Sequence, residues 1–198
     1  MSRRLNMCGF SMAKMRSLFG SGDLQAVDRV FRGLASDLGD SFAFHDEARR
    51  ILETAIMKGV PFPGLETESQ LHYKVASALT GDEQELLWTE ASSYGADAME
   101  VGFRRYARKH GSPETRAFVR GLVEGLPIFG QNLPEDGEVY AAIGLAKLRF
   151  FRPGLVDLRD QIAFRAGPKH EASEFAAEFC GWIDEIIDAG LDLWYATG

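Results

Sequence analysis

The segment from residue 171 to 189 constrains the fold most, because its apolar residues can share one side only in a helix. Four large apolar residues follow one another there at spacings of four, three and four: Phe175, Phe179, Trp182 and Ile186. This spacing places side chains on one face of an α-helix, and a face of that size must be buried against other elements. The sequence therefore predicts a long closing helix that packs on a core.

The acidic residues of the same segment also share one side of the predicted helix. At 100° per residue, five of them fall within about 100° of one another, and they are Glu171, Glu174, Glu178, Glu185 and Asp188. No Lys or Arg occurs between positions 171 and 192. Like charges one helical turn apart repel by a few tenths of a kcal/mol, which suggests that something compensates them.

We take these five acidic residues as the candidate partner-binding site, with three interpretations open. The first is a basic protein partner, whose approach the negative field would accelerate. The second is neutralisation by the chain's own basic segments, such as Arg149, Arg152, Arg159 and Arg165. The third is a plainly solvated helix face, which needs neither.

Turn and cap residues divide the rest of the chain into further elements. Asp23 is a good N-cap, Ser112-Pro113-Glu114 is a strong helix start, and Gly59 is a helix stop. The predicted strands cover residues 5–10 and 191–195, and a loose segment surrounds Pro153. The predicted helices cover residues 11–19, 24–34, 46–58, 67–79, 82–88, 96–109, 113–124, 135–148 and 171–189.

These elements predict a mostly α-helical α+β fold with short N- and C-terminal strands able to pair. A length of 198 residues and fourteen Phe are enough for one sizeable core, so we expect a single compact domain over residues 1–198. The segment from Ile56 to Pro61 is similar to that from Leu122 to Pro127. This similarity indicates either an internal helix–Gly-x-Pro–helix duplication, over about residues 46–80 and 112–148, or two ordinary helix stops.

Three parts of the chain carry a resemblance to known families. They are the strand and small helix from Arg3 to Phe19, the Gly59-Val60-Pro61 region, and the closing helix and strand from Trp182 to Tyr195. Together they resemble the uncharacterised bacterial families of the YfbM-like type. The resemblance covers less than half of the chain and contains no catalytic motif. It implies a bacterial domain of mixed helices and strands, and it transfers no catalytic residue.

The sequence contains no set of residues at a catalytic or metal-binding spacing. The segment His170-Glu171 with Glu174 lacks the second histidine of a zinc-protease helix, and neither a phosphate-binding loop nor a nucleophile elbow occurs. Cys8 and Cys180 are too few for a disulfide framework or a four-ligand zinc site, so we expect buried, inert thiols. We predict no catalytic residue, no metal and no cofactor.

One basic cluster stands out in an acidic chain. Arg104, Arg105, Arg108 and Lys109 surround Tyr106, a mixture used to hold single strands of nucleic acid. A net charge of −7 opposes a nucleic-acid partner, and a solvated helix end is the simpler interpretation. No run of about 18 apolar residues predicts a membrane span, and no apolar segment of a secretory signal follows the basic N-terminal residues.

The function that fits best is a non-catalytic protein-binding module in the cytoplasm, for example an immunity or antitoxin protein that masks a basic partner. We expect neither a nucleic-acid nor a membrane partner. The alternative is an enzyme of unfamiliar type, with a histidine–carboxylate site that only the fold assembles from His45, His72 and His170. A third hypothesis is an oligomerising module that uses Trp88 or Trp194 on an exposed surface.

Overall fold

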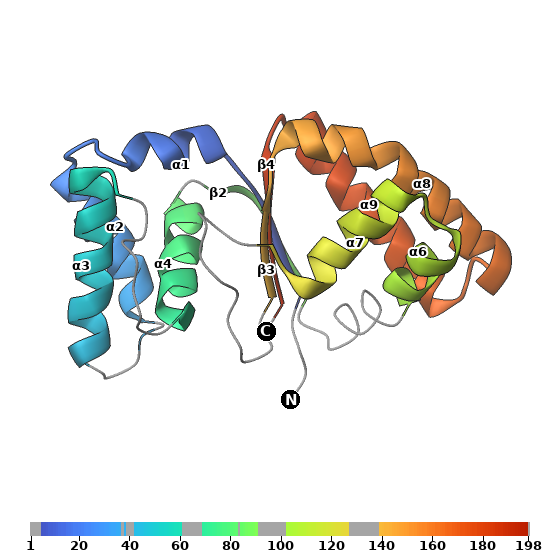
Figure 1. Ribbon diagram of the computed structural model, residues 1–198, viewed down its shortest axis with the longest axis horizontal. Coiled ribbons are helices and arrows are strands. Elements are labelled where there is room, and N and C mark those ends of the chain that lie inside the picture. Colours follow the sequence, from blue (N-terminus) through green and yellow to red (C-terminus); the bar gives the residue numbers. More distant parts are fainter. Residues whose placement is uncertain are drawn as a thin grey trace. The chain divides into compact units, whose positions relative to one another are not determined.

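A computed structural model describes residues 5–36, 38, 42–60, 69–82, 84–90, 102–126 and 139–197 (Figure 1). By its internal contacts the chain divides into two compact units. The first comprises Met1–Gly9, Leu86–Leu126 and Glu135–Gly198, and the second comprises Phe10–Glu85 and Pro127–Pro134. The predicted class, a mostly helical α+β fold, is confirmed, and the predicted single domain over residues 1–198 stays a prediction.

The first unit contains most of a four-stranded sheet. Its strands are β1 (Leu5–Phe10), β2 (Gln84–Glu90), β3 (Val139–Ile143) and β4 (Asp192–Thr197), in the order β2-β1-β4-β3. The N-terminal strand β1 and the C-terminal strand β4 are therefore hydrogen-bonded neighbours, as the sequence predicted. Strands β3 and β4 are antiparallel, with Ala141 opposite Tyr195, and both of these side chains are buried.

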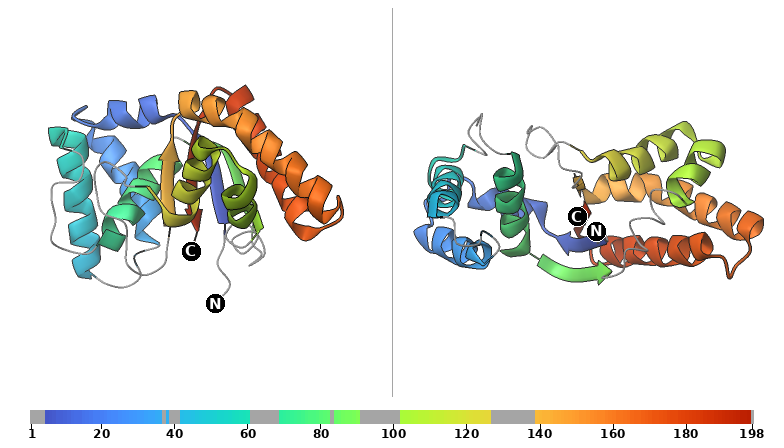
Figure 2. Two further views of the ribbon diagram at one scale, coloured as in Figure 1. Left: turned by 45° about the vertical axis from the view of Figure 1, so that its right-hand side comes forward. Right: turned by 90° about the horizontal axis from the view of Figure 1, so that it is seen from below.

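Four helices lie on one side of this sheet (Figure 1). They are α6 (Arg104–His110), α7 (Pro113–Glu124), α8 (Leu145–Ala166) and α9 (Glu171–Asp188). Helices α8 and α9 run side by side in each of the views (Figures 1 and 2). Phe179 of α9 stacks on Phe175, with ring centroids 5.9 Å apart, and its ring centroid lies 5.4 Å from that of Phe103. These aromatic contacts form the centre of the core that holds α9 in place.

The second unit consists of helices α1 (Met12–Leu18), α2 (Leu24–Ala35), α3 (Phe42–Lys58) and α4 (Ser69–Asp82). The turn after α1 meets the end of α3 through two glycines: a Cβ on Gly20 would lie 3.3 Å from the Cα of Gly59. Both glycines have positive φ, a conformation that L side chains rarely adopt. The backbone N–H of Gly20 donates to the Ala55 carbonyl at 3.1 Å, which joins the two segments.

The predicted helix caps are confirmed. Asp23 Oδ1 accepts a hydrogen bond from the Ala26 N–H at 3.1 Å, and Ser112 Oγ accepts one from the Thr115 N–H at 3.1 Å. Each cap satisfies a backbone donor that has no partner inside its helix. These are local interactions between residues three positions apart, and a sequence pattern detects them directly.

Three of the predicted elements are wrong. Residues 84–90, which overlap the helix predicted over 82–88, form strand β2. Residues 139–143, inside the helix predicted over 135–148, form strand β3, and α8 begins only at Leu145. Pro153 lies within α8 instead of a loose segment. Partners far away in the chain decide whether a short segment pairs as a strand, and they override its local preference.

The structure also distinguishes the two Gly-x-Pro segments. Gly59 after α3 and Gly125 after α7 both have positive φ, at 70° and 81°. Among the described residues, the next element after the first segment is helix α4, whereas the next element after the second is strand β3. An internal duplication predicts that the second copy, over residues 112–148, ends in a helix like α4. Residues 139–143 of this copy form a strand instead. Residues 96–101 of the helix predicted over 96–109 lie outside the described residues.

No helix in the described ranges combines the length and the apolar character needed to cross a bilayer.

Candidate functional site

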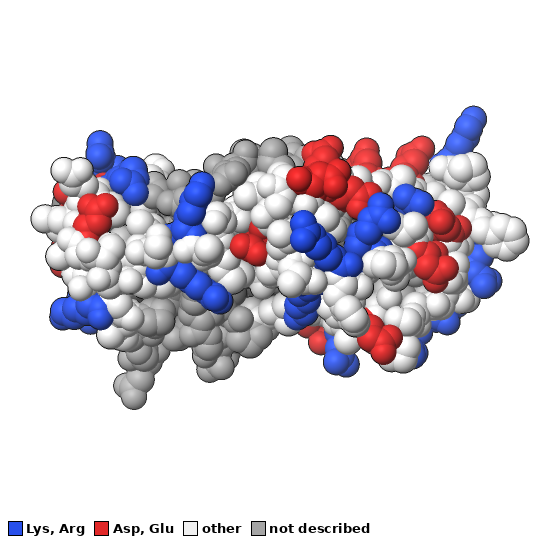
Figure 3. Space-filling view, turned by 90° about the horizontal axis from the view of Figure 1, so that it is seen from above, with Lys and Arg blue, Asp and Glu red and all other residues white. Residues whose placement is uncertain are grey.

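Helix α9 has a buried side and an acidic side, as its sequence predicted. The buried side includes Phe175, Phe179, Ile183 and Ile186, each at most 4% exposed. The five candidate acidic residues are all exposed: Glu171, Glu174, Glu178, Glu185 and Asp188. We call these five residues the acidic face. A row of acidic side chains follows the edge of the surface over α9 in Figure 3.

The carboxylates of the acidic face have no ion-pair partner among the described residues. The arginine that reaches α9 is Arg152 of α8, which donates from Nε and Nη2 to the two carboxylate oxygens of Asp184, at 2.7 and 2.8 Å. Asp184 does not belong to the acidic face. These two hydrogen bonds raise the pKa of Arg152 above its ordinary value, and Asp188 adds a smaller, Coulombic contribution.

The other arginines proposed as internal partners do not pair with the acidic face either. Arg159 pairs with its neighbour Asp160 at 2.8 Å. Within the described part of the chain, Arg149 and Arg165 form no ion pair. The acidic face is therefore exposed to the solvent, and no described residue neutralises it through a direct ion pair.

The helix dipole explains only part of the acidic face. Glu171 and Glu174 lie in the first turn of α9, where the positive end of the dipole stabilises a carboxylate. Glu185 and Asp188 lie at the other end, where a negative charge is unfavourable, and the last turn contains no basic residue. Helix stability thus accounts for the acids at the start of α9 but not for those at its end.

The contacts of the histidines named for the alternative enzyme site are described only in part. His170 caps α9, with its Nδ1 accepting from the Ala172 N–H at 3.1 Å. The ring of His45, in the second unit, meets Phe31 edge-on at 6.0 Å, and the side chain of His72 lies outside the described residues. Within the described ranges, no group of three or more His, Cys, Asp or Glu side chains is placed to hold a metal ion.

The two thiols and one tryptophan singled out in the sequence are buried. Burial raises the pKa of Cys8 to about 12 and, as the main cause, that of Cys180 to about 11, and the Cys180 Sγ–H donates to the Leu155 carbonyl at 3.6 Å. The prediction of buried thiols is therefore confirmed. Trp194 is only 5% exposed, so the hypothesis that it lies on an exposed surface is wrong. The side chain of Trp88 lies outside the described residues.

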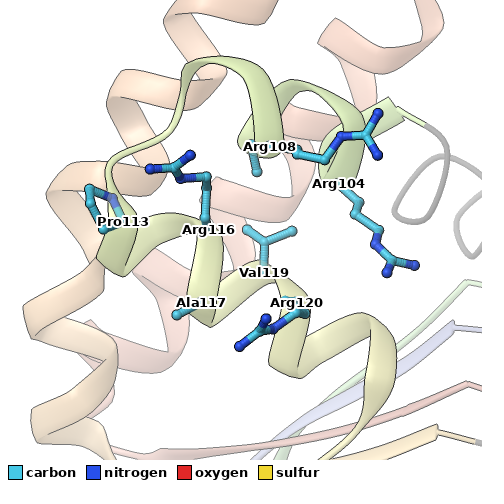
Figure 4. Close-up of a pocket in the computed structure, with 8 residues that line it drawn as sticks. Arg104, Arg108, Pro113, Arg116, Ala117, Val119 and Arg120 are labelled. Atoms are coloured by element: carbon cyan, nitrogen blue, oxygen red, sulfur yellow. The ribbon is translucent and has the colours of Figure 1, made fainter.

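A second charged feature, which the sequence did not predict, is a pocket between α6 and α7. Its volume is about 380 Å³, within the range of small-molecule sites. Four arginines line it, two from each helix, together with four apolar residues: Arg104, Arg108, Arg116 and Arg120, with Ala107, Pro113, Ala117 and Val119. We call it the arginine pocket (Figure 4).

The charges around the arginine pocket are only partly neutralised. At one end, Glu124 lies 2.8 Å from Arg104 and 3.8 Å from Arg120. Arg108 and Arg116 form no ion pair with any described residue. The basic cluster on residues 104–109 indicated half of this site. The repeated i, i+4 arginine spacing on the next helix, Arg116 and Arg120, was the signal for the other half.

Two titratable groups near the ends of α6 and α7 have shifted pKa values. The pKa of His110 is lowered from its ordinary value of 6.5, first by desolvation and then by the charges of Arg165 and Lys109. The pKa of Glu114, at the start of α7, is also lowered. Its causes are a hydrogen bond from its own backbone N–H, the Ser112 side chain and, to a smaller extent, the charge of Arg116.

Fold and surface thus define a mostly helical α+β protein with an acidic helix face and a separate arginine-lined pocket. Comparison with protein-family models, with curated proteins and with solved structures finds no match for this chain. The resemblance to the YfbM-like families stays a prediction.

Proposed function

We propose that this chain is a non-catalytic, bacterial protein-binding module whose acidic face masks a basic surface of a partner protein, as an immunity or antitoxin protein does. The observation that carries the proposal is the acidic face itself. Its five carboxylates are exposed, and none of them forms an ion pair with another described residue. A basic protein surface would supply the missing counter-charges.

The rigidity of α9 supports this role. The helix is held by its buried aromatic side and by the two hydrogen bonds from Arg152 to Asp184. Carboxylates on a fixed helix lose less conformational freedom on binding than carboxylates on a loop. Two exposed positions among these carboxylates carry small residues, Ala177 and Gly181, so no bulky side chain there keeps a partner away from the helix.

The charge distribution along α9 supports the proposal as well. Glu185 and Asp188 lie where the helix dipole disfavours acids, so they extend the acidic face at a small cost in helix stability. Their contribution is explained if the whole length of the helix meets a partner. The partner's surface would then be basic, in the bacterial cytoplasm, and association would be accelerated by electrostatic attraction.

The test starts with the whole chain as bait in a native bacterial lysate, followed by identification of the captured protein and measurement of its association rate at increasing salt. The decisive variant is Glu174→Lys with Glu178→Lys, which reverses the centre of the acidic face. A matched control is Asp157→Lys with Asp160→Lys, which makes the same charge change on exposed positions of α8. We expect the first variant to slow association at low salt by at least about tenfold and the control to slow it far less.

Two results would contradict the proposal. One is an association rate that does not change with salt or with charge reversal at Glu174 and Glu178. The other is an equal loss of rate in the two variants, because the effect would then come from the net charge of the protein and not from the acidic face.

A further inference from the structure

The arginine pocket carries an inference that is independent of the acidic face, because different helices build it. In each of its two helices, a pair of arginines is separated by four positions and therefore lies on one side: Arg104 with Arg108 on α6, and Arg116 with Arg120 on α7. Such like-charged pairs repel each other in the folded protein. Both arginine pairs border the same pocket, so the repulsion among four positive charges acts around this one pocket.

The internal acid Glu124 relieves this repulsion at one end only. It pairs with Arg104 and approaches Arg120, while Arg108 and Arg116 remain without an ion-pair partner among the described residues. Figure 4 shows the four guanidinium groups spread around the rim in different directions. A ligand that engages several of them must therefore carry more than one anionic group.

The floor of the pocket is apolar. Ala107 and Val119 are buried members of the core, and Pro113 and Ala117 complete the lining. A small hollow with an apolar floor and a cationic rim is suited to a compact organic anion. Guanidinium groups bind phosphate oxygens with paired, charge-assisted hydrogen bonds, which makes phosphate the favoured anionic group.

The acids at its edges argue for a small ligand instead of a nucleic-acid strand. Glu124 stands at one end of the pocket, and Glu114 is close enough to Arg116 for that charge to lower its pKa. A phosphate backbone that continued past the pocket in either direction would approach one of these carboxylates. The net charge of −7 opposes a long polyanion as well.

We propose that the arginine pocket binds a small anion with two or more phosphate groups, and that Arg108 and Arg116 provide its main contacts. The phosphate chemistry has two sources, an inorganic polyphosphate or an organic one such as a nucleoside triphosphate. The organic part of an organic polyphosphate would pack on the apolar floor, whereas an inorganic polyphosphate would contact only the arginines.

The experiment is isothermal titration of the full chain with pyrophosphate and, separately, with adenosine triphosphate. The test variant is Arg108→Ala with Arg116→Ala. The control is Arg105→Ala with Lys109→Ala, which removes two positive charges from α6 at positions that do not line the pocket. We expect the control to bind like the original protein and the test variant to bind about 100-fold more weakly, roughly tenfold for each arginine.

Two further measurements keep the proposal testable if the double variant folds poorly. Pyrophosphate added to the unaltered protein should shift the NMR signals of the Arg108 and Arg116 Nε–H groups and leave that of Arg105 in place. Tighter binding of adenosine triphosphate than of pyrophosphate supports the proposal with an organic ligand, and equal binding supports it with an inorganic one.

Three outcomes would overturn the proposal. The first is no binding of either probe at millimolar concentration. The second is an equal loss of affinity in the test and control variants, which indicates unspecific attraction. The third is a single-stranded oligothymidylate that binds more tightly than both probes and loses affinity equally in the two variants, which indicates a nucleic-acid surface.

Discussion

The contact between Gly154 of α8 and Thr115 of α7 leads to a sharp prediction about stability. A Cβ added to Gly154 would overlap the Thr115 Oγ1, and it would lie 3.5 Å from the Thr115 Cβ and 3.8 Å from its Cγ2. Thr115 is 2% exposed and β-branched, so its side chain has little freedom to rotate away. Gly154→Ala therefore requires α7 and α8 to move apart.

The expected cost follows from two opposing effects. Overpacking of a buried contact costs about 1–3 kcal/mol, while Ala is favoured over Gly inside a helix by about 1 kcal/mol. The difference between these two effects is a decrease in the free energy of unfolding of about 0–2 kcal/mol for Gly154→Ala. For a chain of this size, each kcal/mol lowers the melting temperature by about 2–4 °C.

Chemical denaturation followed by circular dichroism measures this change, with Gly181→Ala as the matched control. Gly181 also lies inside a helix, but a Cβ there would meet nothing within 4 Å, so we expect that variant to be more stable by up to about 1 kcal/mol. Adding Thr115→Ala removes the clashing oxygen, so Gly154→Ala should cost at least about 1 kcal/mol less in that background. Strictly additive effects of the two substitutions would refute the explanation, and so would equal changes in the Gly154 and Gly181 variants.

Three further predictions concern charge, capping and pH. Asp188→Lys should stabilise the protein by about 0.3–1 kcal/mol in thermal unfolding, because it places a cation at the negative end of α9; unchanged or reduced stability would contradict this. His170→Ala should lower the free energy of unfolding by about 1 kcal/mol through loss of the cap on the Ala172 N–H, and His170→Asn should restore it. NMR titration should place the pKa of His110 below 6.5, and Arg165→Ala should raise it. Because folding favours neutral His110, the contribution of this residue to stability is complete above pH 6.5 and is lost as the pH falls from 6.5 through the lower pKa of the folded state. His110→Gln should remove this pH dependence. A pKa above 6.5 in the folded state would contradict the prediction, because the pH dependence would then have the opposite sign.

Apart from α8, the described helices and their approximate ends could be predicted from the sequence, because they depend on neighbours a few positions apart. The four-three-four spacing of apolar residues in α9, the Asp23 and Ser112 caps, and the stop at Gly59 are all local features. The orientation of the acidic face followed from the same periodicity. Its five carboxylates lie opposite the buried side because the two sets of residues differ in phase around one helix.

Contacts between distant segments decided the rest. β3 is a strand because it pairs with β4, 50 to 58 positions later in the chain, and nothing in its own five residues records that partner. Pro153 stays within α8 although proline removes a backbone donor. The arginine pocket exists because α6 and α7 fold against each other, which brings Arg108 and Arg116 to one hollow. A sequence records the charges of such residues, but only the packing of the helices determines that their side chains border the same space.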